Sequence, residues 1–183
     1  MRIAGELRNN NIAEYLLYMW QIEDRIRACG FNTVLLADME IGDNGDDGYR
    51  DAVLKWYEEL IQMMTAEGVR EKGHLQINRN VIILLSDLHA RALDSDGCGR
   101  YKQAYYAALP AIVSYRAKSG NMEMGELESC FECMYGIWLL KLQHKELSAG
   151  TADASARISA FIAILASLYS KEKEGMLDLD KEE

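Results

Sequence analysis

The feature of this sequence that most constrains its fold is that a single proline, Pro110, occurs in 183 residues. Long stretches are rich in Leu, Ala, Glu, Met and Lys, which favour the α-helix, and the glycines gather mostly in short clusters. Proline and glycine are the residues that most often interrupt helices. The sequence therefore predicts an all-α protein whose helices are joined by short loops.

Apolar residues recur at intervals of three and four residues along six segments, as expected of helices that bury one face. Pro110 should kink or split one of these helices, because proline removes a backbone hydrogen bond and crowds the preceding turn. Another helix is apolar on nearly all sides from Cys130 to Leu142, which predicts the buried centre of the fold. The six predicted helices cover residues 11–28, 49–67, 74–93, 101–118, 124–146 and 152–170.

The chain has enough apolar surface for one core, since 49% of its residues are hydrophobic and 27% are charged. We expect a single domain over residues 1–177, an antiparallel bundle-like array in which short loops place consecutive helices side by side. Residues 31–41 add a short helical turn, and the Gly- and Asp-rich residues 42–48 form a loop. The acidic tail, residues 178–183, is expected to fray.

Charge and hydropathy indicate a cytoplasmic protein. The formal net charge is −9 and no basic stripe occurs, which disfavours nucleic acid as a partner. Residues 1–11 lack the apolar run of a secretory signal, and no segment approaches the roughly 20 apolar residues of a membrane span. Without a signal, the four cysteines are expected to remain thiols in a reducing compartment.

Two acidic loops resemble calcium-binding loops but lack the required ligands. An EF-hand loop has oxygen donors at positions 1, 3 and 5 and a glutamate at position 12. Counted from Asp43, the twelfth residue is Leu54; counted from Asp94, it is Tyr105. We therefore expect solvated turns at both places.

Cysteines and histidines give no convincing metal or redox site. Cys130 and Cys133 form a CxxC pair on an apolar helix, but structural zinc would need two more ligands, so small core residues are the simpler interpretation. Glu71 and His74 match half of a di-iron motif, and His89 lies about 22 Å from His74 along one helix at roughly 1.5 Å per residue. Nucleotide-binding and hydrolase motifs are also missing, so we expect no metal and no cofactor, and the motif-bearing enzyme classes lose their usual support.

Polar residues on the apolar faces of three predicted helices are the remaining candidates for a site. A helical wheel places Glu23, the pair His74 and Asn78, and Lys141 among apolar neighbours. Burying such groups without partners costs a few kcal/mol. In one interpretation these residues are structural: His74 and Asn78 cap a helix, Glu23 pairs with Arg27, and Lys141 extends its amine to solvent. In the other interpretation they line a pocket.

In the second interpretation, Glu23, His74 and Asn78 form a polar pocket for a small ligand. Trp20 or Tyr15 provides a wall of this pocket, and Lys141 completes it. The pocket lies between the first, third and fifth predicted helices.

Two segments resemble signature sequences of a known family. Residues 11–24 and 71–78 are similar to conserved segments of the DUF4924 family, and the similarity extends to residues 135–143 and 173–175. The resemblance implies a compact helical fold, a source among the Bacteroidetes and no assigned function. The loop at residues 42–48 departs from the family pattern, because it is looser than expected.

Three functional classes stay open. The first is a non-catalytic, cytosolic interaction or scaffolding domain, acting as a homodimer or with another protein partner. The second is a small-molecule-binding domain that uses the polar pocket, and the third is an enzyme of unknown class. We favour the first over the second, because it requires no catalytic constellation.

Overall fold

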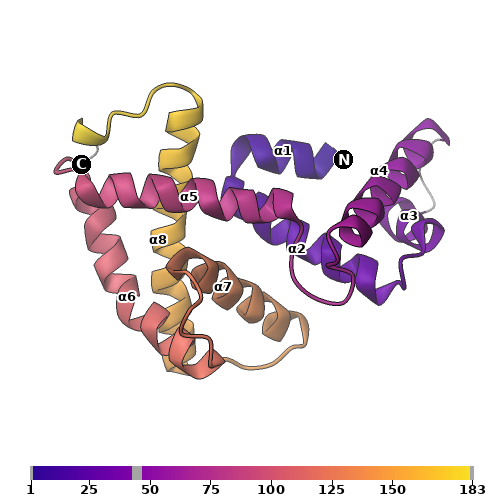
Figure 1. The fold of residues 1–183 in the computed structure, drawn as a ribbon. Coiled ribbons are helices and arrows are strands. Elements are labelled where there is room, and N and C mark those ends of the chain that lie inside the picture. Colours follow the sequence, from indigo (N-terminus) through magenta and orange to yellow (C-terminus); the bar gives the residue numbers. More distant parts are fainter. Residues whose placement is uncertain (1, 43–46, 182–183) are drawn as a thin grey trace. The chain divides into compact units, whose positions relative to one another are not determined.

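The computed structural model describes residues 2–42 and 47–181, and over these residues it confirms the all-α class (Figure 1). Eight α-helices and no strand occur in this part of the chain. A short 3₁₀-helix, η2 (Leu179–Lys181), follows the last of them. The α-helices are α1 (Arg2–Asn10), α2 (Ile12–Ala28), α3 (Thr33–Ile41), α4 (Asp47–Ala66), α5 (Gln76–Asp94), α6 (Gly99–Ser119), α7 (Glu126–Leu142) and α8 (Ala149–Lys173).

Six of these helices, α2 and α4 to α8, correspond to predicted ones, but the predicted count of about six is too low. α1 is only nine residues long, mostly polar, and contains Gly5, so it has too few apolar residues to be recognised as a helix from the sequence. α3 is a nine-residue helix where the sequence predicts only a turn. Asn32 caps it, because the side-chain oxygen accepts a hydrogen bond from the backbone N–H of Leu35 at 3.1 Å.

Most of the loop predicted at residues 42–48 cannot be compared, because residues 43–46 lie outside the described residues. The first residue of one acidic loop, Asp43, is among them. α3 ends before Gly42, whose φ of 60° lies in the region that glycine adopts readily. α4 begins at Asp47.

α6 passes through Pro110 as one continuous helix, so of the two predicted outcomes, a kink or a split, the split does not occur. Ala108 and Ile112, which flank the proline, are both buried. α6 also packs against α7 and α8. Tertiary packing of an apolar face provides most helix stability in proteins, and here it offsets the backbone hydrogen bond that proline removes.

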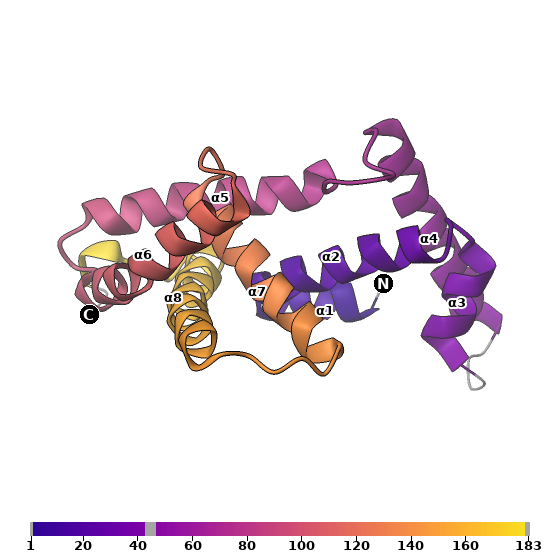
Figure 2. The same cartoon turned by 90° about the horizontal axis from the view of Figure 1, so that it is seen from below.

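The described chain divides into two compact units. The first contains residues up to 10 and residues 14–81, and therefore α1, most of α2, α3, α4 and the first turns of α5. Within it α3 packs against α4, and the two helices lie side by side in Figure 1 and again in Figure 2. Its buried residues include Leu16, Trp20, Ile22, Ile26, Leu36, Val53, Tyr57, Met64 and Leu75.

The second unit contains residues 11–13 and the chain from residue 82 onward. Its three helices α6, α7 and α8 all pack against one another. The prediction that residues 130–142 of α7 form the buried centre is wrong, because within this stretch only Cys130, Phe131 and Ile137 are buried and Leu142 is 62% exposed. α8 instead provides most of the buried side chains, namely Ile158, Phe161, Ile162, Leu165, Ala166 and Leu168.

The C-terminal segment is docked as far as residue 181, in contrast to the frayed tail that the sequence predicts. Ser95 Oγ donates a hydrogen bond to the carbonyl oxygen of Leu179 at 2.7 Å. A Cβ placed on Gly97 would overlap the backbone of Asp180, so the segment can approach only a glycine there. Residues 182–183 lie outside the described residues.

Candidate functional site

In the first unit, three of the polar residues singled out in the sequence come together around a buried carboxylate. Glu23 of α2 is fully buried. Its Oε2 accepts a hydrogen bond from His74 Nδ1 at 2.6 Å, and its Oε1 accepts one from Asn78 Nδ2, also at 2.6 Å. The backbone N–H of Leu75 donates a further hydrogen bond to Oε1 at 3.0 Å. We call Glu23, His74, Leu75 and Asn78 the Glu23 cluster.

The Glu23 cluster lies at the start of α5. The carbonyl of Leu75 accepts hydrogen bonds from the N–H groups of Asn78 and Arg79, which opens the helix. A negative charge at this end is favoured by the helix dipole. Trp20, one turn before Glu23, stacks on the His74 ring with 4.0 Å between centroids and 11° between planes. The cluster thus holds the start of α5 against α2.

Arg27, one turn after Glu23, extends this contact to the connection between α4 and α5. Its guanidinium donates hydrogen bonds to the carbonyls of Val69, Arg70 and Gly73. It also pairs with Asp24 at 2.8 Å, so the alternative in which Arg27 pairs with Glu23 is not the one observed. Neighbouring turns of α2 therefore organise one loop.

Tyr15 makes no hydrogen bond to the Glu23 cluster, and Lys141 lies in the second unit. Tyr15 is buried, and the Arg8 guanidinium lies 5.7 Å from its ring centroid. Burial raises the pKa of Tyr15, and the Glu23 charge adds to the increase. Lys141 of α7 is exposed, so its predicted place on a buried face is wrong. α7 is apolar on nearly all sides, and a helical wheel cannot identify which side of such a helix is covered.

A groove of about 770 Å³ lies in the second unit among α6, α7, α8 and the α7–α8 loop. Apolar and small side chains line most of it. Its polar lining residues are Ser114, Tyr115, Lys118, Gln143, Lys145, Ser148 and Thr151. Its other lining residues are Ala111, Cys133, Gly136, Ile137, Leu139, Leu140, Gly150 and Ala154. We call this hollow the α6–α8 groove.

Gly136 is a helix-weakening residue in the lining of the α6–α8 groove. It lies in the middle of α7, where glycine is roughly 1 kcal/mol less favourable than alanine. A Cβ added to it would meet no atom within 4 Å, so no close packing against the rest of the protein requires a glycine here. Gly136 therefore contributes no side chain to the lining of the groove.

Two titratable side chains in the groove keep their protons at neutral pH. Tyr115 donates a hydrogen bond to Glu132 at 3.2 Å, and burial raises its pKa to about 12. Burial also raises the pKa of the Cys133 thiol. The neighbouring Cys130 is fully buried and its pKa is raised as well, so neither member of the CxxC pair is a reactive thiolate.

His89 of α5 belongs to a second polar network, also in the second unit. Its Nδ1 lies 2.6 Å from the hydroxyl of Tyr101, and its Nε2 lies 3.8 Å from Glu126. Tyr105 donates a hydrogen bond to the same carboxylate at 2.9 Å. Burial lowers the pKa of His89, and the Glu126 charge partly offsets this. Sequence patterns place His89 at a helix face but do not identify these partners.

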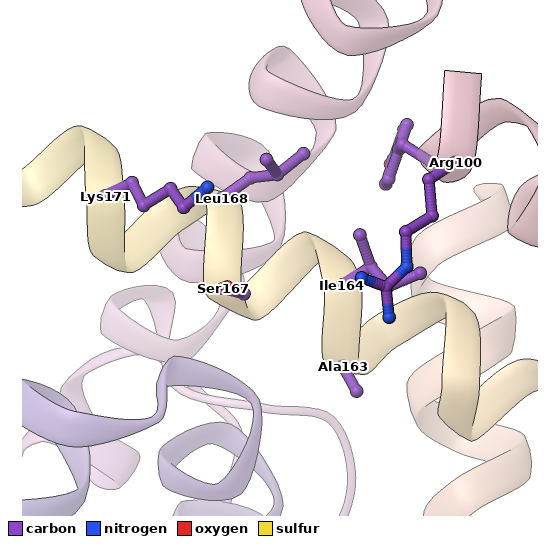
Figure 3. Close-up of a pocket in the computed structure, with 7 residues that line it drawn as sticks. Arg100, Ala163, Ile164, Ser167, Leu168 and Lys171 are labelled. Atoms are coloured by element: carbon purple, nitrogen blue, oxygen red, sulfur yellow. The ribbon is translucent and has the colours of Figure 1, made fainter. Parts of the chain in front are cut away.

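A smaller hollow of about 300 Å³ borders this network. Figure 3 shows that one wall consists of successive turns of α8, with Arg100 of α6 facing them. Its basic lining residues are Arg100 and Lys171, and Tyr101, which bonds to His89, also borders it. Among the described residues, no group of three or more His, Cys, Asp or Glu side chains is placed to hold a metal ion.

The sequence analysis missed the α6–α8 groove. Two of its features were visible in the sequence: a central glycine in an otherwise apolar helix, Gly136, and small residues at the start of the next helix, Gly150 and Ala154. Neither shows which side of α7 remains uncovered, so the groove could not be located without the structure.

Comparison with known proteins identifies one family. The model of a family described as a domain of unknown function, DUF4924, matches residues 1–176. No curated protein and no solved structure matches the chain. The match spans both compact units.

Proposed function

Since this chain belongs to the DUF4924 family, whose function is unknown, we propose a function from its geometry: a non-catalytic domain that binds a small apolar molecule. The ligand occupies the α6–α8 groove. The observation that carries the proposal is Gly136, a helix-weakening residue that borders open space inside an apolar groove.

The size and lining of the groove support a ligand of this kind. Pockets for small molecules usually enclose about 300–1,000 Å³ and are mostly apolar, with a few polar groups. The groove has a volume of about 770 Å³ and has Ile137, Leu139 and Leu140 in its lining. An apolar ligand that covers this surface removes it from water, and each Å² of apolar surface removed contributes about 25 cal/mol to binding.

The chemistry of the lining favours binding over catalysis. An enzyme usually needs an acid, base or nucleophile with a pKa near the working pH. Tyr115 and Cys133 have pKa values shifted upward by burial, away from neutrality. They are therefore suited to line a pocket rather than to transfer protons.

Binding of primary alcohols of increasing length tests the proposal. Affinity for hexanol, octanol and decanol should rise about fourfold per added methylene, at roughly 0.8 kcal/mol for each buried CH₂. Isothermal titration calorimetry measures it. Gly136→Leu should abolish binding while keeping the fold, because leucine fills the groove and favours helix more than glycine does.

Gly5→Leu provides the matched control. Gly5 lies in α1, and a Cβ added to it also meets nothing within 4 Å. This variant should bind the alcohols like the wild type. Binding of decanol by Gly136→Leu with wild-type affinity, or no binding of any alcohol by the wild type, would contradict the proposal.

A second candidate function, a homodimeric interaction domain, is favoured by the surface of α3. Val34, Leu35 and Met39 are 53%, 45% and 59% exposed on this short helix. Exposed apolar side chains grouped on one element mark protein contacts. Light scattering after size exclusion should show a dimer that Met39→Lys dissociates and Met122→Lys, at another exposed methionine, does not. A monomeric wild type would exclude this candidate.

We propose further that the protein is cytoplasmic, acts without nucleic acid or membrane, and forms one domain over residues 1–177 with consecutive helices antiparallel. The net charge of −9 supports the absence of nucleic acid. The four cysteines, Cys29, Cys98, Cys130 and Cys133, are all thiols, which suits a reducing compartment.

A further inference from the structure

We infer that the molecule bound in the α6–α8 groove is an anionic amphiphile, a free aliphatic carboxylate whose head group lies near Lys118, Lys145 and the start of α8. The inference rests on the proposed function of the groove and names its ligand class. The apolar part of the lining takes the aliphatic chain, and the polar part takes the carboxylate.

The charge of the groove is opposite to that of the whole chain. The chain has 29 acidic and 20 basic residues, yet the groove is lined by two lysines and by no Asp or Glu. A neutral apolar ligand would give no reason for this local excess of positive charge. A carboxylate is attracted to it.

The two lysines have no acidic partner among the described residues that would explain their position. Lys118 lies in the last turn of α6, where the helix dipole favours a cation. Lys145 lies just after α7, and its backbone N–H donates a hydrogen bond to the carbonyl of Leu140 at the end of that helix. Both side chains are exposed, so their amines can move to meet a ligand at the groove.

The first turn of α8 borders the groove and adds hydrogen-bond donors to its lining. Ser148 caps the helix by accepting a hydrogen bond from the N–H of Thr151 at 3.2 Å. The preceding N–H groups, at Ala149 and Gly150, have no partner within an α-helix. The first turn of α8 contains no acidic residue, so the positive end of its dipole is not neutralised locally.

Gly150 makes this helix start accessible to a ligand. A Cβ added to Gly150 would meet no atom within 4 Å, so the backbone borders open space on the groove side. Backbone N–H groups at a helix start bind carboxylates and phosphates when an anion can approach them. The apolar groove, the two lysines and the start of α8 therefore all favour the same ligand class, an aliphatic carboxylate.

Comparing decanoate with decanol tests the inference, because the two probes share a chain and differ in charge. At pH 8 and low salt, decanoate should bind the wild type about tenfold more tightly than decanol, and added salt should reduce only this difference. Lys118→Ala/Lys145→Ala should lose about tenfold in affinity for decanoate, the combined effect of two exposed charge contacts, and none for decanol.

The double variant Lys55→Ala/Lys72→Ala is the matched control, since both lysines are exposed and lie in the first unit. It should bind both probes like the wild type. Equal binding of decanoate and decanol, unchanged in Lys118→Ala/Lys145→Ala, would overturn the ligand class and leave the proposed function standing. Failure of both probes to bind would overturn both proposals.

Two further experiments test where the ligand binds and whether it is a free acid or a lipid. Gly136→Leu should lose decanoate binding; retention would place the carboxylate elsewhere and overturn the inference. Flotation with phosphatidylglycerol vesicles tests a lipid source of the same chemistry. The protein should not float with them, and flotation that depends on Lys118 and Lys145, without binding of free decanoate, would overturn the assignment to a free acid.

Discussion

At the scale of single residues, Glu23 is expected to contribute most to the stability of the first unit. Replacing it with alanine should destabilise the protein by about 3–5 kcal/mol, because two buried donors and the partly exposed His74 lose their acceptor. Glu23→Gln keeps one acceptor oxygen and should cost about 1–3 kcal/mol. Urea unfolding measures both changes.

Glu59→Gln is the control for this series, because Glu59 is exposed and should change stability by less than about 0.5 kcal/mol. A Glu23→Ala variant as stable as this control would show that the Glu23 cluster does not hold α5 against α2.

His89 should make stability depend on pH. Because burial lowers its pKa in the folded protein below 6.5, the unfolded chain takes up the proton first as the pH falls. The contribution of neutral His89 to stability is therefore complete above about pH 6.5. It is lost as the pH falls from there to the lower pKa that His89 has in the folded protein. Urea unfolding between pH 7.5 and 5.5 should show a steeper loss for the wild type than for His89→Gln. Parallel curves would contradict this role.

At the scale of elements, the docked C-terminal segment depends on Gly97. Gly97→Ala should release η2, because the added methyl overlaps the backbone of Asp180. Hydrogen exchange and limited proteolysis at residues 176–181 should both accelerate. Gly99→Ala is the control, since a Cβ on Gly99 meets nothing within 4 Å. Unchanged protection in Gly97→Ala would show that the segment tolerates a side chain there.

The helices themselves were predictable where their apolar stripes are long. α2, α4 and α8 differ from the predicted segments by no more than about three residues at either end, the usual uncertainty of sequence-based bounds. α1 was missed because its residues are mostly polar, and α3 because nine residues contain too few repeats of the pattern.

At the scale of the whole molecule, α8 bears on where the protein resides. By length and composition α8 alone among the described helices could cross a membrane, a weak criterion that core helices also meet. Its residues Ile158, Phe161, Leu165 and Leu168 are buried against other parts of the protein. The cytoplasmic location proposed above predicts that cell fractionation recovers the protein with the soluble fraction. Recovery with the membranes, resistant to salt, would contradict this.

The sequence by itself determined the helical class and six of the helices, and it singled out Glu23, His74 and Asn78, whose meeting was one of two alternatives that it left open. Helical periodicity is local, so it can be read along the chain. A carboxylate among apolar residues must find donors, which is why the out-of-pattern residues were found bonded to one another.

The tertiary structure alone decided which faces are covered. It carries α6 through Pro110, docks η2, exposes Lys141 and leaves the α6–α8 groove open beside Gly136. Each of these outcomes depends on contacts between residues far apart in the chain. An apolar helix such as α7 has no sequence signal for its covered side, because burial on any side would satisfy it equally.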